Sequence, residues 1–131
     1  MNIKDFMLES VEETQEIKLS RFKSPFVIKT ITEEENDTIR KASMKPVKKG
    51  GIMTRELDSV RYSRELMVAC VVEPNFKDSA LCDFYKTLDP LEVPAKMLRA
   101  GEYMQISRAI SKLNGFDDES NEELEEEAKN S

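Results

Sequence analysis

The stretch from Leu66 to Asp117 carries most of the information in this chain. It runs LMVACVVEPNFKDSALCDFYKTLDPLEVPAKMLRAGEYMQISRAISKLNGFD. Three motifs divide it: Pro74-Asn75-Phe76, Gly101-Glu102-Tyr103 after Met97-Leu98, and Asn114-Gly115-Phe116-Asp117. Each stands where a helix should begin or end, because proline and glycine interrupt regular structure. Their order and spacing predict a compact helical unit.

Apolar spacing predicts the helices of this unit. Residues 56–73 should form the central buried helix, with a stripe made by Leu57, Val60, Met67 and Val71. Residues 102–114 should form the last helix, which Gly115 ends in a left-handed conformation. Between them, Asp78 or Ser79 should cap a short helix with an inner face of Leu81, Phe84, Tyr85 and Leu88. The prolines at 90 and 94 predict a turn or a short irregular helix.

The N-terminal third has a different pattern. Residues 3–11 predict a short helix with Ile3, Phe6, Met7 and Val11 on one face. Residues 15–31 alternate and predict a β-hairpin that turns at Lys23-Ser24-Pro25. Thr32 and Glu35 form a capping-box pattern that should open a helix ending near Ala42, with Ile39 inward. Residues 43–54 should be a loop. The expected fold is α+β, a mostly helical bundle with an N-terminal β-hairpin.

Composition limits the function. A chain of 131 residues supports one domain, predicted as residues 1–116. Residues 117–131 hold eight acidic groups and one lysine, and we expect a flexible acidic tail there. The chain has no histidine, the usual general base and zinc ligand, and no phosphate-binding glycine motif, so we expect no histidine-based catalytic set and no cofactor or metal site. Cys70 and Cys82 are expected to be buried thiols. The start does not have the pattern of a signal peptide, and the longest apolar run is too short for a membrane span, so a soluble, cytoplasmic protein is expected.

Six basic residues and no acidic one lie between Arg40 and Arg55. Three interpretations stay open for this basic cluster. It could be a solvated loop, a dock for the acidic tail or for an acidic partner, or a phosphate-binding loop. The last interpretation is the weakest, because the cluster has no interleaved aromatic residues. The motifs Pro74-Asn75-Phe76 and Gly101-Glu102-Tyr103 also have two interpretations, as breaks between helices or as recognition residues. A break between helices explains Pro74 and Gly101 but not Asn75 or Glu102.

The ordered set of motifs resembles a family of small phage proteins. The matching residues are Arg21-Phe22, Ile31-Thr32, Val68-Ala69-Cys70-Val71-Val72, Pro74-Asn75, Asp78, Leu81, Met97-Leu98, Gly101-Glu102-Tyr103, Asn114-Gly115-Phe116-Asp117 and Ala128-Lys129-Asn130. Together they resemble the tail assembly chaperones of tailed phages and PBSX-like prophages, the XkdN-like family. The turn at 23–25 is shorter than is usual in that family, and segment 44–55 has little counterpart there.

The resemblance implies a non-enzymatic protein of the host cytoplasm that is absent from the mature virion. It implies binding to the helical tape measure protein and recruitment of tail tube protein, in some relatives through a longer frameshifted form. Ala128-Lys129-Asn130 permits a slippery message for such a form. We expect partner contacts at Pro74, Asn75, Phe76, Gly101, Glu102, Tyr103 and Phe116, and none with nucleic acid or membrane. The alternative function is a small prophage DNA-binding regulator, although no predicted helix has a basic face. A third class, an accessory subunit of an enzyme, stays open.

Overall fold

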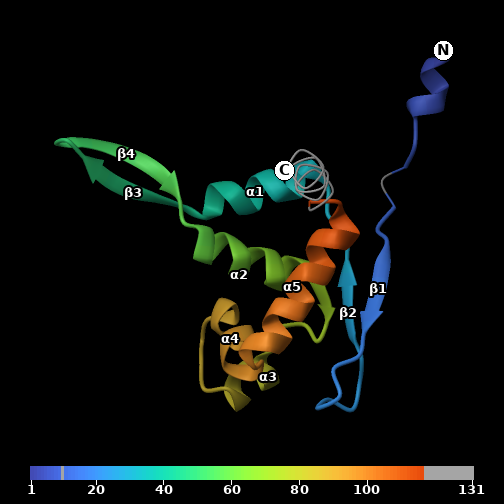
Figure 1. Cartoon of the computed structure of the whole chain (residues 1–131), viewed down its shortest axis with the longest axis vertical. Helices are drawn as coiled ribbons and strands as arrows, with labels where there is room; N and C mark the ends of the chain where they lie inside the picture. Colours follow the sequence, from blue (N-terminus) through green and yellow to red (C-terminus); the bar gives the residue numbers. More distant parts are fainter. Residues whose placement is uncertain (10, 117–131) are drawn as a thin grey trace, which may run out of the picture.

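The computed structural model describes residues 1–9 and 11–116. These residues form an α+β fold in which helices pack beside a three-stranded sheet, and a separate hairpin projects from the body (Figure 1). The helices are α1 (Glu33–Ala42), α2 (Ser59–Cys70), α3 (Ser79–Phe84), α4 (Val93–Met97) and α5 (Ala100–Asn114), with 3-10 turns η1 (Ile3–Phe6) and η2 (Pro90–Glu92). The strands are β1 (Thr14–Ile17), β2 (Phe26–Lys29), β3 (Met44–Lys49), β4 (Ile52–Leu57) and β5 (Val71–Glu73).

The expectation of a mostly helical bundle with one N-terminal hairpin is wrong. Strands also form on both sides of α2, and they make two separate sheets. One sheet has the order β1-β2-β5, and β2 is antiparallel to both neighbours. The predicted hairpin is therefore present, but β5 extends it to three strands. This addition has a physical reason, because an isolated two-stranded hairpin is marginal in water.

The predicted loop at 43–54 is the second correction. Residues 44–57 form the β3–β4 hairpin, in which Met44 pairs with Leu57 and Lys49 pairs with Ile52. Gly50 and Gly51 form its two-residue turn, and both have positive φ angles, of 57° and 80°. Two-residue hairpin turns of this kind require positive φ, which glycine adopts at low cost. The glycine pair therefore closes a hairpin here and does not end regular structure.

Local capping residues set the helix ends. Thr32 accepts from the Glu35 amide at 3.2 Å while the Glu35 carboxylate accepts from the Thr32 amide at 3.3 Å, which confirms the predicted capping box. Asp78 caps α3, and Gly115 ends α5 with a φ angle of 77°, both as predicted. Asp58 caps α2, so this helix begins at Ser59 and ends at Cys70, inside the predicted range of 56–73.

The core lies between the inner face of the three-stranded sheet and the helices. Its fully buried side chains come from β2, α2, the segment after β5, α4 and α5, and include Phe26, Ile28, Met67, Cys70, Phe76, Val93, Ile106 and Ile110. Helix α2 contacts α1, α4, α5, η2 and β5, and so is central. It is only half-buried, however, because Val60 is 62% exposed. Leu57, which precedes the helix, is 43% exposed.

Two further predicted faces are wrong. The first residues form only the short turn η1, which buries no side chain, and no helix continues to residue 11. In the α3 region the predicted inner face includes Phe84 and Leu88, which are 74% and 99% exposed. Because α3 ends at Phe84, helical spacing cannot be continued to Leu88. Cys82 takes the buried position in this helix.

Candidate functional site: an apolar groove between α2, α4 and α5

A groove of about 570 Å³ lies between the first turns of α2, helix α4 and the first turns of α5. We call it the α2–α5 groove. Its lining is mainly apolar, and its one charged member is Arg64. Val60 and Met104 are 62% and 51% exposed although they are large apolar residues. The full lining is Ser59, Val60, Ser63, Arg64, Ala95, Leu98, Ala100, Tyr103 and Met104.

Helical spacing explains why these residues share one surface. On α2 the lining residues Val60, Ser63 and Arg64 have the spacing i, i+3, i+4, which places them on one face of a helix. On α5 the residues Ala100, Tyr103 and Met104 repeat the same spacing. The two walls are joined by a hydrogen bond of 3.1 Å between the hydroxyls of Ser63 and Tyr103. The groove therefore has a row of side chains on each wall, and the Ser63–Tyr103 hydrogen bond joins the two walls.

Glu102 fixes the start of α5 beside the groove. Its carboxylate accepts from the Arg21 guanidinium at 2.6 and 3.2 Å and from the Arg99 amide at 2.7 Å. Arg21 also donates to the carbonyl of Met97 at 2.9 Å. These hydrogen bonds, that of Arg21 above all, lower the pKa of Glu102 to about 2. Glu102 thus ties the loop between β1 and β2 to the end of α4 and to the first turn of α5.

The predicted contact residues do not form one site. Tyr103 lines the α2–α5 groove, while Gly101 and Glu102 lie in the same turn of α5. Pro74 and Asn75 lie on another surface, where they line a smaller pocket of about 400 Å³ with Phe84. The Phe76 side chain is in the core and has no exposed surface. Phe116 is 40% exposed, and its amide donates to the Ser111 carbonyl at 2.9 Å.

Most residues of the α2–α5 groove are not among the contact residues predicted from the sequence. Of its lining, only Tyr103 was among the predicted contact residues. Val60 was assigned to a buried stripe, and Met104 was not singled out. A signal was present, because Met104 directly follows Tyr103, which lies at the edge of the α5 face that Ile106 and Ile110 bury in the core. An apolar residue beside a core face on an otherwise polar helix surface suggests a contact outside the core.

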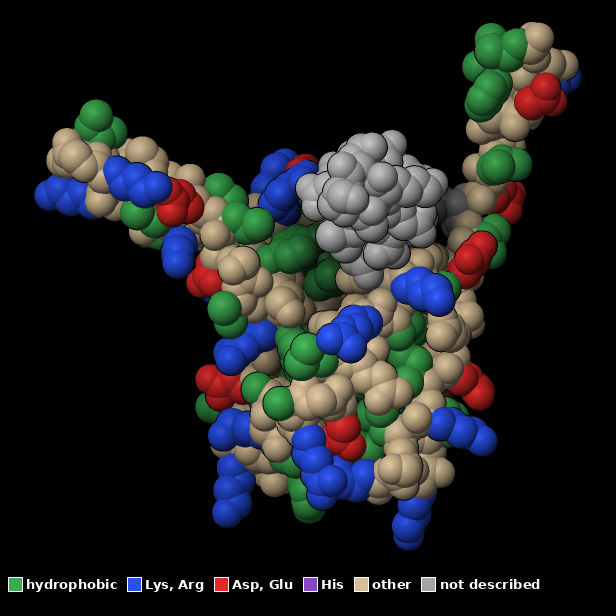
Figure 2. Space-filling model, viewed as in Figure 1, with side chains coloured by type: hydrophobic (Ala, Val, Ile, Leu, Met, Phe, Trp, Pro, Cys, Tyr) green, Lys and Arg blue, Asp and Glu red, His purple; other side chains and the backbone are tan. Residues whose placement is uncertain are grey.

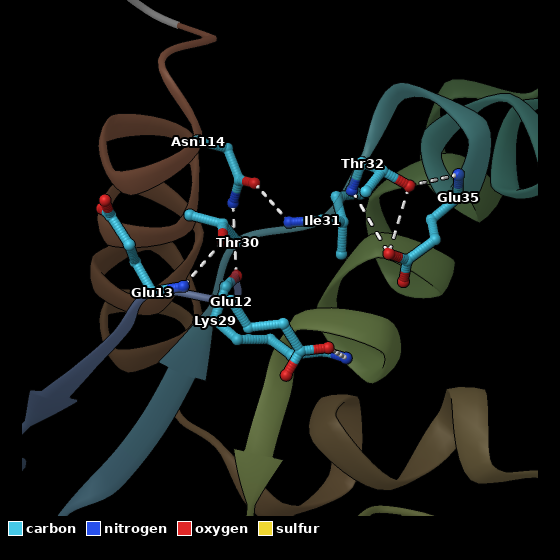
Figure 3. A network of polar contacts seen from close by, with 8 residues as sticks. All are labelled: Glu12, Glu13, Lys29, Thr30, Ile31, Thr32, Glu35 and Asn114. Atoms are coloured by element: carbon cyan, nitrogen blue, oxygen red, sulfur yellow. Dashed lines mark hydrogen bonds and ion pairs between the residues drawn. The ribbon is translucent and has the colours of Figure 1, made fainter. Parts of the chain in front are cut away.

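Asn114 has a structural role that explains part of the last motif (Figure 3). Its side-chain oxygen accepts from the Ile31 amide at 2.9 Å, and its amide group donates to the carbonyls of Ile110 at 2.9 Å and Lys29 at 3.4 Å. The end of α5 is thereby joined to the segment that leads from β2 into α1. Glu13 and Thr30 extend this network to β1 through hydrogen bonds of 2.9 and 3.0 Å.

The basic cluster lies mainly on the projecting β3–β4 hairpin (Figure 2). Half of it is paired within the chain: Arg40 and Lys41 with Asp37, and Lys49 with Glu56. The pairs hold the pKa of Asp37 below its ordinary value, first through the hydrogen bond from Arg40. Exposed pairs of this kind contribute little to stability. The cluster is therefore partly neutralised where α1 ends and the hairpin begins.

Residues 1–9 and 11–116 include no group of three potential metal-ligating side chains close enough to hold an ion. Within the same ranges, each helix is too short or too polar to cross a bilayer. Cys70 and Cys82 are free and buried, as predicted, and burial raises the pKa of the Cys70 thiol to about 12. The predicted acidic tail lies outside the described residues.

Comparison with known proteins identifies the class. The family model of the phage XkdN-like tail assembly chaperone proteins matches residues 3–129, so the chain belongs to this family of phage tail assembly chaperones. The resemblance seen in the motifs is confirmed. Two relatives from Bacillus subtilis (strain 168) are the phage-like element PBSX protein XkdN, 38% identical, and protein YqbN, 43% identical. Each alignment spans 109 residues, 81% of this chain and 72% of the relative.

A crystal structure of protein YqbN has the same fold. It superposes with a TM-score of 0.72 and 31% sequence identity, and the alignment covers 89% of this chain and 98% of that chain. The α+β arrangement described above is thus that of a solved relative, which supports the correction of the helical-bundle prediction.

Proposed function

We propose that this chain binds the tape measure protein of its phage element and keeps it soluble before the tail tube forms around it. The family assigns a role in tail assembly, and the proposal adds a partner and a surface. The observation that carries the proposal is the α2–α5 groove, in which Val60 and Met104 expose apolar side chains in a mainly apolar depression. The proposed role is non-enzymatic, in the host cytoplasm, with the chaperone absent from the mature virion.

The groove matches the recognition of a helix. Amphipathic helices bind apolar grooves through side chains spaced i, i+3, i+4 and i+7. Both walls of this groove present residues at the first three of those spacings, so a third helix can pack between α2 and α5 at the usual interaxial distance of roughly 8–10 Å. Arg64 at the edge favours a partner segment with a carboxylate beside its apolar stripe. A tape measure protein is a long helical chain with apolar stripes, which would aggregate if they stayed uncovered.

Recruitment of tail tube protein is the second part of the proposal. The surface around Pro74, Asn75 and Phe84 is separate from the groove, so it can hold another protein at the same time. Phe84 is 74% exposed there and stacks edge-to-face on Tyr85 at 4.9 Å. A longer frameshifted form would add a further contact to the tube protein. Sequencing the gene tests that form, because a Lys129 codon of AAG removes the slippery site.

Co-expression with the tape measure protein tests the groove. We expect the native chain to raise the soluble fraction of that protein and to co-purify with it. Val60→Glu and Met104→Glu should each reduce the co-purified amount at least tenfold, because a charge would face the apolar helix. Both side chains are exposed, so these variants should fold like the native chain, which circular dichroism and thermal melting will check.

The β3–β4 hairpin supplies matched controls. Ile52 and Met53 are 68% and 63% exposed, so Ile52→Glu and Met53→Glu make the same chemical change on an equally exposed apolar residue outside the groove. Both controls should keep the tape measure protein bound. Equal loss in all four variants would contradict the groove assignment. A salt-sensitive shift of duplex DNA by the native chain, with no effect on tape measure solubility, would favour the DNA-binding alternative.

A further inference from the structure

The N-terminal arm, residues 1–9, carries a second uncovered apolar surface. Ile3, Phe6, Met7 and Leu8 are 63%, 66%, 68% and 84% exposed, and η1 buries no side chain. Figure 2 shows apolar side chains gathered at the end of this arm, which projects well away from the body. Four large apolar residues on a projecting segment form a surface of the kind that binds another protein. The family match begins at residue 3, so the arm belongs to the matched region.

We propose that the arm of one copy of this chain binds the α2–α5 groove of a second copy, so that two chains form a reciprocal dimer. The arm has the features that the groove should select. Ile3, Phe6 and Met7 are spaced i, i+3, i+4, the same spacing that both walls of the groove present. In the free chain only Ile3–Phe6 form a 3-10 turn, so the arm presents this stripe when it extends into an α-helix on binding the groove.

Charge supports the same pairing. Asp5 and Glu9 are four residues apart and lie beside the apolar stripe if the arm is helical. The one charged lining residue of the groove is Arg64, and Arg99 precedes the helix that forms its wall. Among the ion pairs within residues 1–9 and 11–116, none uses these four side chains. Opposite charges are therefore available on the two surfaces.

The placement of the arm favours a second copy over the chain's own groove. The backbone is anchored at Glu13 by two hydrogen bonds to Thr30, near the end of α5 where Asn114 contacts Ile31. The groove is at the other end of α5, where Tyr103 lies. From its anchor the arm leads away from α5, on the side opposite the β3–β4 hairpin (Figure 1). A second copy can present its groove to the arm without that constraint.

The interface is large enough for a specific dimer. A buried aromatic side chain alone covers roughly 150–250 Å², and each arm brings one Phe and three aliphatic or Met side chains. If all four side chains of each arm are buried, two arms and two grooves together reach the roughly 1,000 Å² that a specific interface requires. The dimer would close the groove until the tape measure protein displaces the arm. This last consequence rests on the proposed function, whereas the dimer itself does not.

Measurement of the mass of the purified full chain in solution tests the dimer. Light scattering at micromolar concentrations should give twice the chain mass of 15.1 kDa. Phe6→Glu and Met104→Glu should each give a monomer, while the exposed hairpin control Ile52→Glu should stay dimeric. An equal mixture of Phe6→Glu and Met104→Glu should associate again, more weakly than the native chain, because one intact arm then meets one intact groove.

Three results would each overturn the inference: the native chain is monomeric, the Phe6→Glu variant remains dimeric, or the mixture is no more associated than its components. The proposed function has separate readouts. If the native chain is a monomer and Met104→Glu does not bind the tape measure protein, the dimer proposal is wrong and the proposed function stands. If Phe6→Glu is monomeric and neither chain binds the tape measure protein, the dimer stands and the proposed function fails.

Discussion

Replacement of Asn114 by alanine should destabilise the fold, because this side chain joins the end of α5 to the segment between β2 and α1. The side-chain oxygen accepts from Ile31, and the amide group donates to Ile110, both at 2.9 Å. The third bond, to Lys29, is long at 3.4 Å and counts for little. Two good intramolecular hydrogen bonds at roughly 0.5–1.5 kcal/mol each give an expected loss of about 1–3 kcal/mol in the free energy of unfolding.

Chemical and thermal unfolding measure that loss. For a domain of this size, each kcal/mol lowers the melting temperature by about 4 °C, so a decrease of roughly 4–12 °C is expected. Hydrogen exchange adds a local readout, since the Ile31 amide should lose its protection more than amides in the core. The exposed Lys112→Ala on the same helix is the control, and we expect it to change stability by less than about 0.5 kcal/mol.

A different result would refute this reasoning. If Asn114→Ala unfolds within about 0.5 kcal/mol of the native chain, the network in Figure 3 does not hold α5 to the β2–α1 segment. The Asn of the last motif would then need another explanation, and contact with a partner would be the first to test.

Three other predictions follow from the core, the Glu102 contacts and Cys70. Ile110→Ala should lower the free energy of unfolding by roughly 2–5 kcal/mol in chemical denaturation, because Ile110 is 1% exposed in the core and alanine leaves a cavity. The hydrogen bonds that lower the pKa of Glu102 stabilise the fold at any pH above the ordinary pKa of about 4.5. This contribution should disappear as the pH falls from about 4.5 to about 2, which is the pKa of Glu102 in the fold. Glu102→Gln should therefore be less stable than the native chain at neutral pH, and the difference should shrink in acid melts. Cys70, buried and with a pKa of about 12, should react with thiol reagents at pH 8 only as fast as the chain unfolds, and rapid labelling of the folded protein would contradict its placement.

Local chemistry explains which parts of the fold could be predicted from the sequence. The capping box at Thr32 and Glu35, the Asp78 cap and the left-handed Gly115 each depend on residues within a few positions of one another. The short range of these interactions makes them visible as motifs. The burial of Ile106 and Ile110 could be predicted equally well, because α5 is long enough for the helical spacing of its apolar residues to be clear.

The β3–β4 hairpin shows where composition misled the prediction. Lysines, a proline and two glycines suggest a loop, yet the glycine pair stands between two flanks of six residues each that pair in register. This symmetry was the available signal. The hairpin contacts the rest of the fold mainly at its base, so it lacks the alternating apolar face by which a strand is usually recognised.

Both the contact between Glu102 and Arg21 and the α2–α5 groove depend on residues that are far apart in sequence. Arg21 and Glu102 are 81 positions apart, and no local pattern links them. The groove likewise takes its walls from α2 and α5 and its end from α4. Single-sequence spacing indicates that Val60 and Met104 lie on helices, but only the packing of those helices shows that both stay exposed on one surface.

Hydrogen exchange of this chain with and without the tape measure protein tests the central claim most directly. The account predicts slower exchange in peptides that cover residues 59–64 and 95–104, the two walls and the end of the α2–α5 groove. Residues 44–57 of the β3–β4 hairpin should exchange at an unchanged rate. Protection confined to the hairpin, or a complex that leaves both groove segments unprotected, would contradict the account.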